Sequence, residues 1–206
     1  MEKVQVLCHS SIKITGENVI YCDPFRIKDE LHDADYILCT HSHYDHFSPE
    51  DIEKVKNKDT MLIVVEELKD EALKLVDKDH LLLVGPNEEY ILDNLKVKTT
   101  YAYNQNKAFH PKEKRWVGYL LMTKERTYYI AGDTDNIPEI KEIEADVAMI
   151  PIGGTFTMDY KEAAELANLL KAKKIIPIHY GEIVGEKEDA KRFAVLVKGK
   201  EVEIQI

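Results

Sequence analysis

The sequence predicts an α/β fold in which helices cover two mixed β-sheets, and three observations support this prediction. Short apolar segments typical of strands alternate along the chain with segments that begin like helices. The first strand segments are joined by a tight turn, and such an early hairpin argues against a purely parallel sheet. The 206 residues, 44% of them hydrophobic and 32% charged, suit a globular protein with a sizeable core.

Apolar runs bounded by turn residues predict the strands. In the first half of the chain, Gly16, Glu17 and Asn18 form a hairpin turn between two such runs. In the second half, Lys124 and Glu125 separate another pair of strands. The predicted strands are 4–7, Ser11–Thr15, Val19–Cys22, 36–40, 61–65, Leu81–Val84, Glu89–Leu92, Leu95–Tyr101, 117–123, 126–131, 147–151, 174–178 and 202–206.

Two of the predicted helices begin with capping signals. Ser48 suits the N-cap, with Pro49 at the first helical position and Asp51 three residues after the cap. Asp159 caps a helix that runs to about residue 170, and Glu162 completes its capping box. Further helices are predicted at 69–76 and 187–195.

The charge balance limits the kinds of partner. With 28 Lys and Arg against 38 Asp and Glu, the net charge of -10 disfavours a broad grip on nucleic acid. No signal peptide is recognised, and the apolar runs are far too short to span a bilayer. The 3 cysteines lie in strand-like segments without a CxxC pair, which indicates buried side chains in a reducing compartment. We expect a cytoplasmic protein, and its oligomeric state is left open, a homo-oligomer included.

The clearest functional signal follows the apolar run 36–40. It is the segment His41-Ser42-His43-Tyr44-Asp45-His46. Residues two apart on a strand share a face, so His41 and His43 can point together at one ion. Asp45 and His46 lie just beyond, where the chain must turn, and could point at a second ion. Because crowded imidazoles and carboxylates are costly to bury, the segment predicts metal binding; the alternative is a solvated His-rich turn.

Other polar residues follow predicted strands, where ligands gather in α/β folds. Asp133 lies in Gly-Asp-Thr-Asp at 132–135, and His179 follows the strand 174–178. Thr155 lies in Gly-Gly-Thr after the strand 147–151. Each alone is as well explained by a turn or a hydrogen-bonded loop. Together with the cluster at 41–46 they favour a single site.

These motifs together resemble the metallo-β-lactamase superfamily. The motif HSHYDH at 41–46 is followed by GDTD at 132–135 and IHYG at 178–181. The segments CHSSIKI near Cys8 and YCDPF near Asp23 are similar to the opening hairpin and Asp-Pro corner of that superfamily. IGGTFTMD, which ends at Asp159, resembles the UlaG-like branch, including small bacterial proteins known only as metal-dependent hydrolases. The resemblance covers nearly the whole chain and implies one domain over 1–206, a four-layer αββα sandwich.

The resemblance also implies a site for two divalent ions, usually Zn²⁺, with Mn²⁺ or Fe as alternatives. In family terms His41 and His43 would hold the first ion, Asp133 would bridge both ions, and Asp45, His46 and His179 would hold the second. Neutral imidazoles and carboxylates suit zinc, and a pair of such ions can share and activate a hydroxide.

Three polar residues would support these ligands. Asp45 could orient the hydroxide as well as bind metal, which makes it the catalytic candidate. His9 and Asp23 fit a role behind the ligands, where hydrogen bonds steer the imidazoles. A turn or core polar residue explains His9 and Asp23 equally well.

The chain departs from the family pattern at one position. A third histidine for the first ion is expected on the strand that precedes Val117, but this chain has Ala102-Tyr103-Asn104 at the corresponding place. The next histidine, His110, comes six residues later. Either Asn104 contributes a weak oxygen ligand or the loop folds back so that His110 replaces the expected residue. Imidazole is the better zinc ligand, which favours His110.

The segment 101–116 is basic and aromatic within an acidic protein, and a loop of this length is often functional. We expect it to line the cleft and to select a small anionic substrate, such as a phosphate ester or a sugar-phosphate lactone. The candidate substrate-binding residues are Tyr103, Lys112, Arg115 and Thr155. The alternative is a solvated loop whose cations only offset the negative charge.

The predicted function is a cytoplasmic metal-dependent hydrolase in which a metal-activated hydroxide attacks a small anionic substrate such as a phosphodiester. The sequence has no GxSxG nucleophile. Three alternatives remain. A sugar-phosphate lactonase of the UlaG type would keep the same fold, a nuclease is disfavoured by the acidic balance, and a non-catalytic metal-binding module is left open by Asn104.

Overall fold

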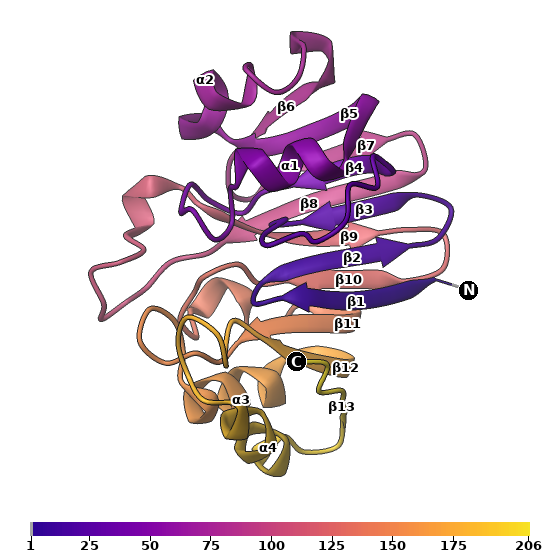
Figure 1. Cartoon of the computed structure of the whole chain (residues 1–206). Helices are drawn as coiled ribbons and strands as arrows, with labels where there is room; N and C mark the ends of the chain where they lie inside the picture. Colours follow the sequence, from indigo (N-terminus) through magenta and orange to yellow (C-terminus); the bar gives the residue numbers. More distant parts are fainter. Residues whose placement is uncertain (1) are drawn as a thin grey trace. The chain divides into compact units, whose positions relative to one another are not determined.

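The computed structural model describes residues 2–206 (Figure 1). These residues divide into two compact units, the first ending at Gly85 and the second spanning Pro86–Ile206. Each unit is built on one mixed β-sheet with its own helices, and each is described by itself. The two mixed sheets agree with the predicted α/β fold class. The single domain expected over 1–206 stays a prediction.

The first unit contains a six-stranded sheet with its strands in sequence order. The strands are β1 (Lys3–Cys8), β2 (Ser11–Thr15), β3 (Val19–Cys22), β4 (Ala34–Leu38), β5 (Lys56–Val65) and β6 (Leu81–Val84). β1, β2 and β3 pair antiparallel as the predicted hairpins, whereas β3 to β6 pair parallel. The parallel half is buried on its central strands, since Ile37, Leu38 and Ile63 are fully inaccessible.

Three elements in this unit differ from their predicted bounds by two residues or more. β4 spans Ala34–Leu38 instead of the predicted 36–40. β5 begins at Lys56, directly after helix α1 (Pro49–Val55), because Asn57 and Thr60 both hydrogen-bond the Ala34 carbonyl of β4. The predicted helix 69–76 is reduced to a 3₁₀ turn η1 (Glu66–Leu68) and the short helix α2 (Lys69–Ala72). Its N-terminus carries no side-chain cap, so little stabilises a longer helix there. A further 3₁₀ turn, η2 (Lys78–His80), leads into β6.

Asp51 of α1 anchors the loop that follows β3. Ser48 caps the helix as predicted, accepting a hydrogen bond from the Asp51 backbone N–H. The Asp51 carboxylate in turn accepts hydrogen bonds from the backbone N–H groups of Arg26 and Ile27, at 2.8 and 2.9 Å. Burial raises the pKa of Asp51, but the hydrogen bonds from Ser48, Lys54 and the two backbone groups outweigh it and lower the pKa overall. The carboxylate is therefore a structural anchor for residues 26 and 27.

We expect Asp51→Asn to lower the free energy of unfolding by about 2 kcal/mol, since hydrogen bonds to a charged acceptor are lost. A lowered folded pKa means that this contribution is present above the ordinary carboxyl pKa and disappears as the pH falls through the folded value. The variant should therefore show a smaller loss of stability on acidification, measured by denaturant unfolding at several pH values. Glu50→Gln, on the same helix but exposed, should leave both properties unchanged. Equal stability of Asp51→Asn and wild type would contradict the anchor.

The second unit contains a seven-stranded sheet in the order β13-β12-β11-β10-β9-β8-β7. The strands are β7 (Glu89–Leu92), β8 (Leu95–Tyr101), β9 (Val117–Met122), β10 (Thr127–Ile130), β11 (Glu144–Pro151), β12 (Lys171–Ile178) and β13 (Glu201–Val202). β7 to β10 pair antiparallel and β10 to β13 pair parallel. The last strand is shorter than the predicted 202–206.

Two helices accompany the parallel half of this sheet. α3 (Tyr160–Leu169) begins with the predicted capping box of Asp159 and Glu162, and α4 (Lys187–Leu196) packs against α3. Leu166 and Phe193 are fully buried in the core that these helices share with β11 and β12. Two short 3₁₀ turns, η3 (Lys112–Lys114) and η4 (Pro138–Ile140), lie in the connections.

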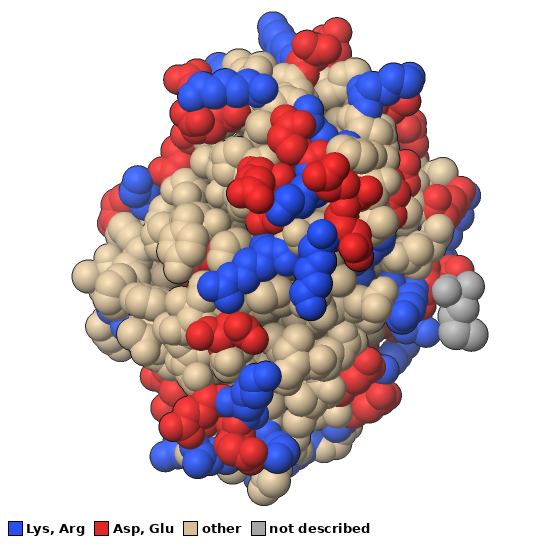
Figure 2. All heavy atoms as spheres, viewed as in Figure 1, with Lys and Arg blue, Asp and Glu red and all other residues tan. Residues whose placement is uncertain are grey.

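Charged side chains of both signs are interspersed over the face drawn in Figure 2. Ion pairs among the described residues include Lys13 with Asp33 at 2.7 Å and Lys173 with Asp146 at 2.6 Å. Among residues 2–206, no helix combines the length and apolarity needed to cross a bilayer.

Candidate metal centre

The predicted His cluster of the first unit lies in a coiled turn after β4. Because β4 ends at Leu38, His41 and His43 do not share a strand face, and the strand argument for their pairing was wrong. The backbone N–H groups of His46 and Phe47 both donate to the His43 carbonyl, which folds the segment on itself. His41 Nε2 nevertheless lies 3.0 Å from His43 Nδ1, so the turn brings the two imidazoles together.

Asp23 and Thr40 form a buried hydrogen-bond network behind these imidazoles. Asp23 accepts hydrogen bonds from the Thr40 N–H and Oγ1, each at 2.8 Å, and lies 2.7 Å from His46 Nδ1. Thr40 Oγ1 is also 3.0 Å from His41 Nδ1. Burial raises the pKa of Asp23, and His46 and the Thr40 hydrogen bonds oppose that rise. The network fixes both rings at Nδ1, which is what a ligand that binds through Nε2 needs.

Asp45 lies between two imidazoles of the same unit. Its Oδ2 is 3.3 Å from His9 Nε2 and 3.6 Å from His46 Nε2. All three residues are buried. His9 therefore contacts the predicted catalytic carboxylate, and Asp23 contacts the His46 imidazole; their role in steering metal ligands stays a prediction.

A second cluster, in the other unit, centres on Asp133. Its Oδ2 lies 3.2 Å from His110 Nε2 and 3.1 Å from His179 Nε2, and all three side chains are buried. Asp133 follows β10 and His179 follows β12, so two strand ends and the loop after β8 supply the three residues. The loop does fold back, and it places His110, rather than Asn104, against Asp133.

Three residues of these clusters have left-handed backbones. The φ angles are 55° at His9, 48° at Asp23 and 60° at His179. Non-glycine residues rarely adopt this conformation, and Asn, Asp and His do so more often than others. Such conformations persist where surrounding structure determines them, and they gather at functional sites.

The four residues predicted to bind substrate are Tyr103, Lys112, Arg115 and Thr155, and the first two are already engaged with Glu139. Lys112 Nζ donates to Glu139 at 2.6 Å and lies over the rings of Tyr101 and Tyr103 at 4.8 and 4.7 Å. The Tyr103 hydroxyl also donates to Glu139. The charge of Lys112 is thus already compensated. Arg115 and Thr155 are exposed, and the Arg115 backbone N–H donates to the Lys112 carbonyl at 3.1 Å. Within residues 2–206, no side-chain hydrogen bond or ion pair joins Arg115 or Thr155 to Lys112 or Tyr103.

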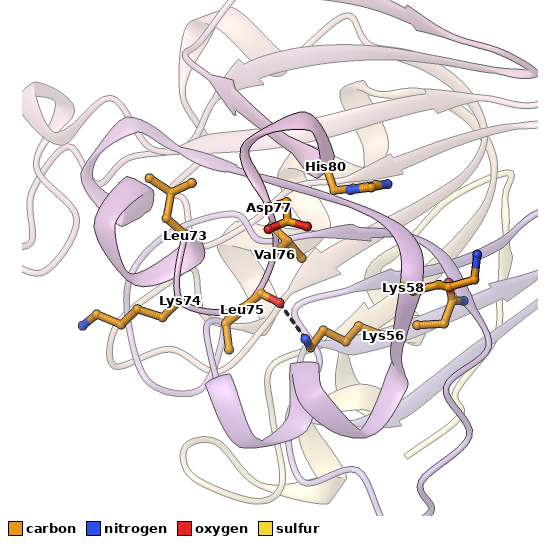
Figure 3. A pocket seen from close by; sticks show the side chains of 9 residues that line it. Lys56, Lys58, Leu73, Lys74, Leu75, Val76, Asp77 and His80 are labelled. Carbon is orange, nitrogen blue, oxygen red and sulfur yellow. Dashed lines mark hydrogen bonds between the residues drawn. The ribbon is translucent and has the colours of Figure 1, made fainter.

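A pocket of about 270 Å³ in the first unit lies apart from the His cluster (Figure 3). It is lined by Lys56, Lys58, Lys74, His80 and neighbouring residues, and Lys56 donates to the Leu75 carbonyl at 2.6 Å. This pocket lies at the amino ends of β5 and β6, whereas the His cluster follows the carboxyl end of β4. Because these strands are parallel, the two features lie at opposite edges of the sheet.

The donor set of both clusters fits divalent metal ions. Imidazole nitrogens and carboxylate oxygens are the ligands that zinc and related ions take in proteins. In each unit such donors approach within 4.8 Å of one another, as do His41 with His43 and Asp133 with His179.

Sequence reasoning missed Thr40, whose position directly before His41 is the only local signal for its role.

Comparisons with known proteins agree with this donor set. The family profile described as "Beta-lactamase superfamily domain" matches residues 3–179. A "UPF0173 metal-dependent hydrolase" of Lysinibacillus sphaericus is 34% identical over 215 residues, covering 95% of this chain and 92% of that protein. A relative of the same name from Thermococcus onnurineus is 30% identical, covering 97% of this chain and 94% of that protein.

Solved structures give the same result. The crystal structure of a Parabacteroides distasonis protein assigned as a metal-dependent hydrolase superposes with a TM-score of 0.83 at 27% identity, covering 99% of this chain and 92% of that one. The metallo hydrolase Igni18 of Ignicoccus hospitalis shares the fold, with a TM-score of 0.76 at 21% identity over 98% of this chain and 94% of that one. The predicted fold class and superfamily are confirmed, and the UlaG-like branch stays a prediction. The chain belongs to the metallo-β-lactamase superfamily and is a metal-dependent hydrolase.

Proposed function

We propose that this hydrolase uses a dinuclear centre, with Zn²⁺ as the resident ion, to cleave a small anionic substrate such as a phosphodiester. The observation that carries the proposal is the Asp133 carboxylate, whose Oδ2 lies within 3.2 Å of two buried imidazole nitrogens. A carboxylate oxygen between two imidazoles is the arrangement expected of a bridging ligand.

The proposed ligand roles follow the superfamily resemblance. By that resemblance, His41, His43 and His110 would hold the first ion, Asp45, His46 and His179 would hold the second, and Asp133 would contribute to both. Contacts within the first unit support the roles of His41 and His46, since Nδ1 of His41 is engaged by Thr40 and Nδ1 of His46 by Asp23. Their Nε2 atoms would therefore be the nitrogens that hold a bound ion.

When bound, the ions would lower the pKa of a coordinated water and stabilise the negative charge that develops on the substrate. The chain's own residues hold and orient the reactants. Asp45 is positioned by His9 and His46, at 3.3 and 3.6 Å, and is suited to accept a proton from the attacking water. Burial of these groups strengthens every electrostatic interaction among them.

Anionic specificity rests on the loop between β8 and β9. Lys112 is compensated by Glu139 and Lys107 by Asp135, so two of the four cations of this loop are paired with carboxylates of the protein. Arg115 is exposed beside Lys112 and has a left-handed φ of 57°. We propose that Arg115 contributes the substrate-directed charge of this loop, whereas Lys112 and Tyr103 mainly shape it.

Metal removal tests the proposed function. We expect chelator-treated protein to lose hydrolysis of bis(p-nitrophenyl) phosphate by more than about 100-fold, because hydroxide generation at neutral pH depends on the ions. Adding Zn²⁺, Mn²⁺ or Fe²⁺ back separately should restore activity with about two ions per chain, measured by elemental analysis.

A panel that also contains a sugar-phosphate lactone separates the two substrate classes, and Arg115→Gln should raise KM for the preferred anion with little change in kcat. Activity that survives complete metal removal, or a protein that binds no metal, would overturn the proposal. If the metal-loaded protein hydrolyses only the lactone, the substrate class is a sugar-phosphate lactone and not a phosphodiester.

A further inference from the structure

Asn104 occupies the position where the superfamily pattern predicts a histidine, and its surroundings show how the chain uses it instead. Its backbone N–H donates to the His110 carbonyl at 2.7 Å, which closes the loop between the two residues. Its side-chain Nδ2 donates to the Phe156 carbonyl at 2.7 Å and lies 3.1 Å from His110 Nδ1. Asn104 thus holds the loop at both its backbone and its side chain.

The Phe156 carbonyl completes the environment of the His110 ring. His110 Nδ1 lies 3.1 Å from this oxygen, so a proton on Nδ1 can be donated to it. The lone pair of His110 then resides on Nε2, the atom that lies 3.2 Å from Asp133 Oδ2. The Asn104 amide and the His110 ring share one carbonyl acceptor, so the amide limits how the ring can turn.

A second anchor holds the start of the same loop. Asp135 accepts hydrogen bonds from the Gln105 backbone N–H at 2.9 Å and from Lys107 Nζ at 2.6 Å. The Asp135 backbone N–H donates to the Tyr103 carbonyl at 2.9 Å. Asp135 is buried and lies two residues after Asp133. The loop that carries His110 is therefore tied to the segment that carries the central carboxylate.

We infer that Asn104 and Asp135 are positioning residues that let His110 replace the expected strand histidine. In this role Asn104 donates a hydrogen bond to the Phe156 carbonyl and is not a metal ligand. The inference rests on the proposed metal-binding role of His110. The Asn104 side chain could act in two ways, as a metal ligand or as a positioning donor. A ligand would act through the carbonyl oxygen of Asn104, whereas a positioning donor acts through its amide nitrogen.

Asn104→Asp separates these uses because it keeps the size of the side chain and replaces the donor by an anionic oxygen. Carboxylate is the stronger metal ligand, so a ligand role predicts tighter binding. A positioning role predicts repulsion from the Phe156 carbonyl and about 10- to 100-fold weaker metal binding, the usual effect of losing a residue that orients a ligand. Asp135→Asn should weaken binding in the same direction because the Lys107 ion pair is lost.

The experiment measures Co²⁺ and Zn²⁺ affinity by chelator competition, together with the visible absorption of the Co²⁺ protein, which reports the ligand geometry. Asn106→Asp is the matched control, since it makes the same change at an exposed position of the same loop and should leave affinity and spectrum unchanged. Thermal unfolding of the metal-free variants separates a folding defect from a positioning defect. Asn104→Asp protein that binds metal as tightly as wild type, or more tightly, overturns the inference. Wild-type protein that binds no metal overturns the proposed function instead.

Discussion

Asp133→Asn should reduce hydrolysis by more than about 100-fold, a larger loss than that caused by residues that only orient metal ligands. The substitution keeps the size of the side chain but removes the negative charge from the oxygen that lies within 3.2 Å of His110 and His179. An amide is a weak ligand and can bridge two cations only poorly. We therefore expect the purified variant to carry fewer ions per chain, as measured by elemental analysis after dialysis.

The variant also removes a buried charge, so its folding needs a separate control. Asp59→Asn makes the same change at an exposed position and should retain full metal content and activity. Circular dichroism should show native secondary structure for both proteins. Full metal content in Asp133→Asn would exclude Asp133 as a required ligand.

Gly153→Ala should lower the free energy of unfolding by about 3 kcal/mol, at the upper end of what overpacking usually costs. A Cβ atom at this position would overlap the carbonyl oxygen of His179 and lie 2.6 Å from Val184 Cγ2. The overlap is with backbone, which cannot rotate away as a side chain can. For a chain of this size, the expected fall in Tm is roughly 6 to 12 °C.

The same clash should displace His179 and weaken metal binding. Gly199→Ala is the informative comparison, because Gly199 has a φ of 67° but nothing within 4 Å of the added Cβ. It should show only the cost of a left-handed alanine, about 1–2 kcal/mol, with unchanged metal affinity. If Gly153→Ala retained wild-type stability and metal affinity, the close packing of Gly153 on His179 would not matter for the site.

Local signals in the sequence predicted most of the fold. The caps at Ser48 and Asp159 depend on residues three positions away, and both are present in the structure. The boundaries of β4 and β5 were missed because they depend on hydrogen bonds from Asn57 and Thr60 to Ala34, more than twenty residues away. Local propensity carries no information on such pairs.

In the candidate site, too, residue types could be predicted from the sequence, whereas contacts between distant residues could not. Residue type and motif pointed to His110, and only the three-dimensional path of the loop shows it against Asp133. Asp135 had no role assigned from the sequence, since its partners Gln105 and Lys107 are 30 and 28 residues away. Asp51 looked like a helix-cap residue, and its contacts with Arg26 and Ile27 had no signal in the sequence.

The left-handed backbones at His9, Asp23 and His179 have a consequence for the history of the family. Glycine adopts this conformation without steric cost, so the backbone alone would favour glycine at all three positions. Histidine and aspartate tolerate this conformation better than most residues, and their contacts with Asp45, His46 and Asp133 give a reason to keep those side chains there. A relative with glycine at one of these positions would retain the path of the chain without the side chain. Such a glycine is an expected mark of a descendant that keeps the fold but has lost the chemistry.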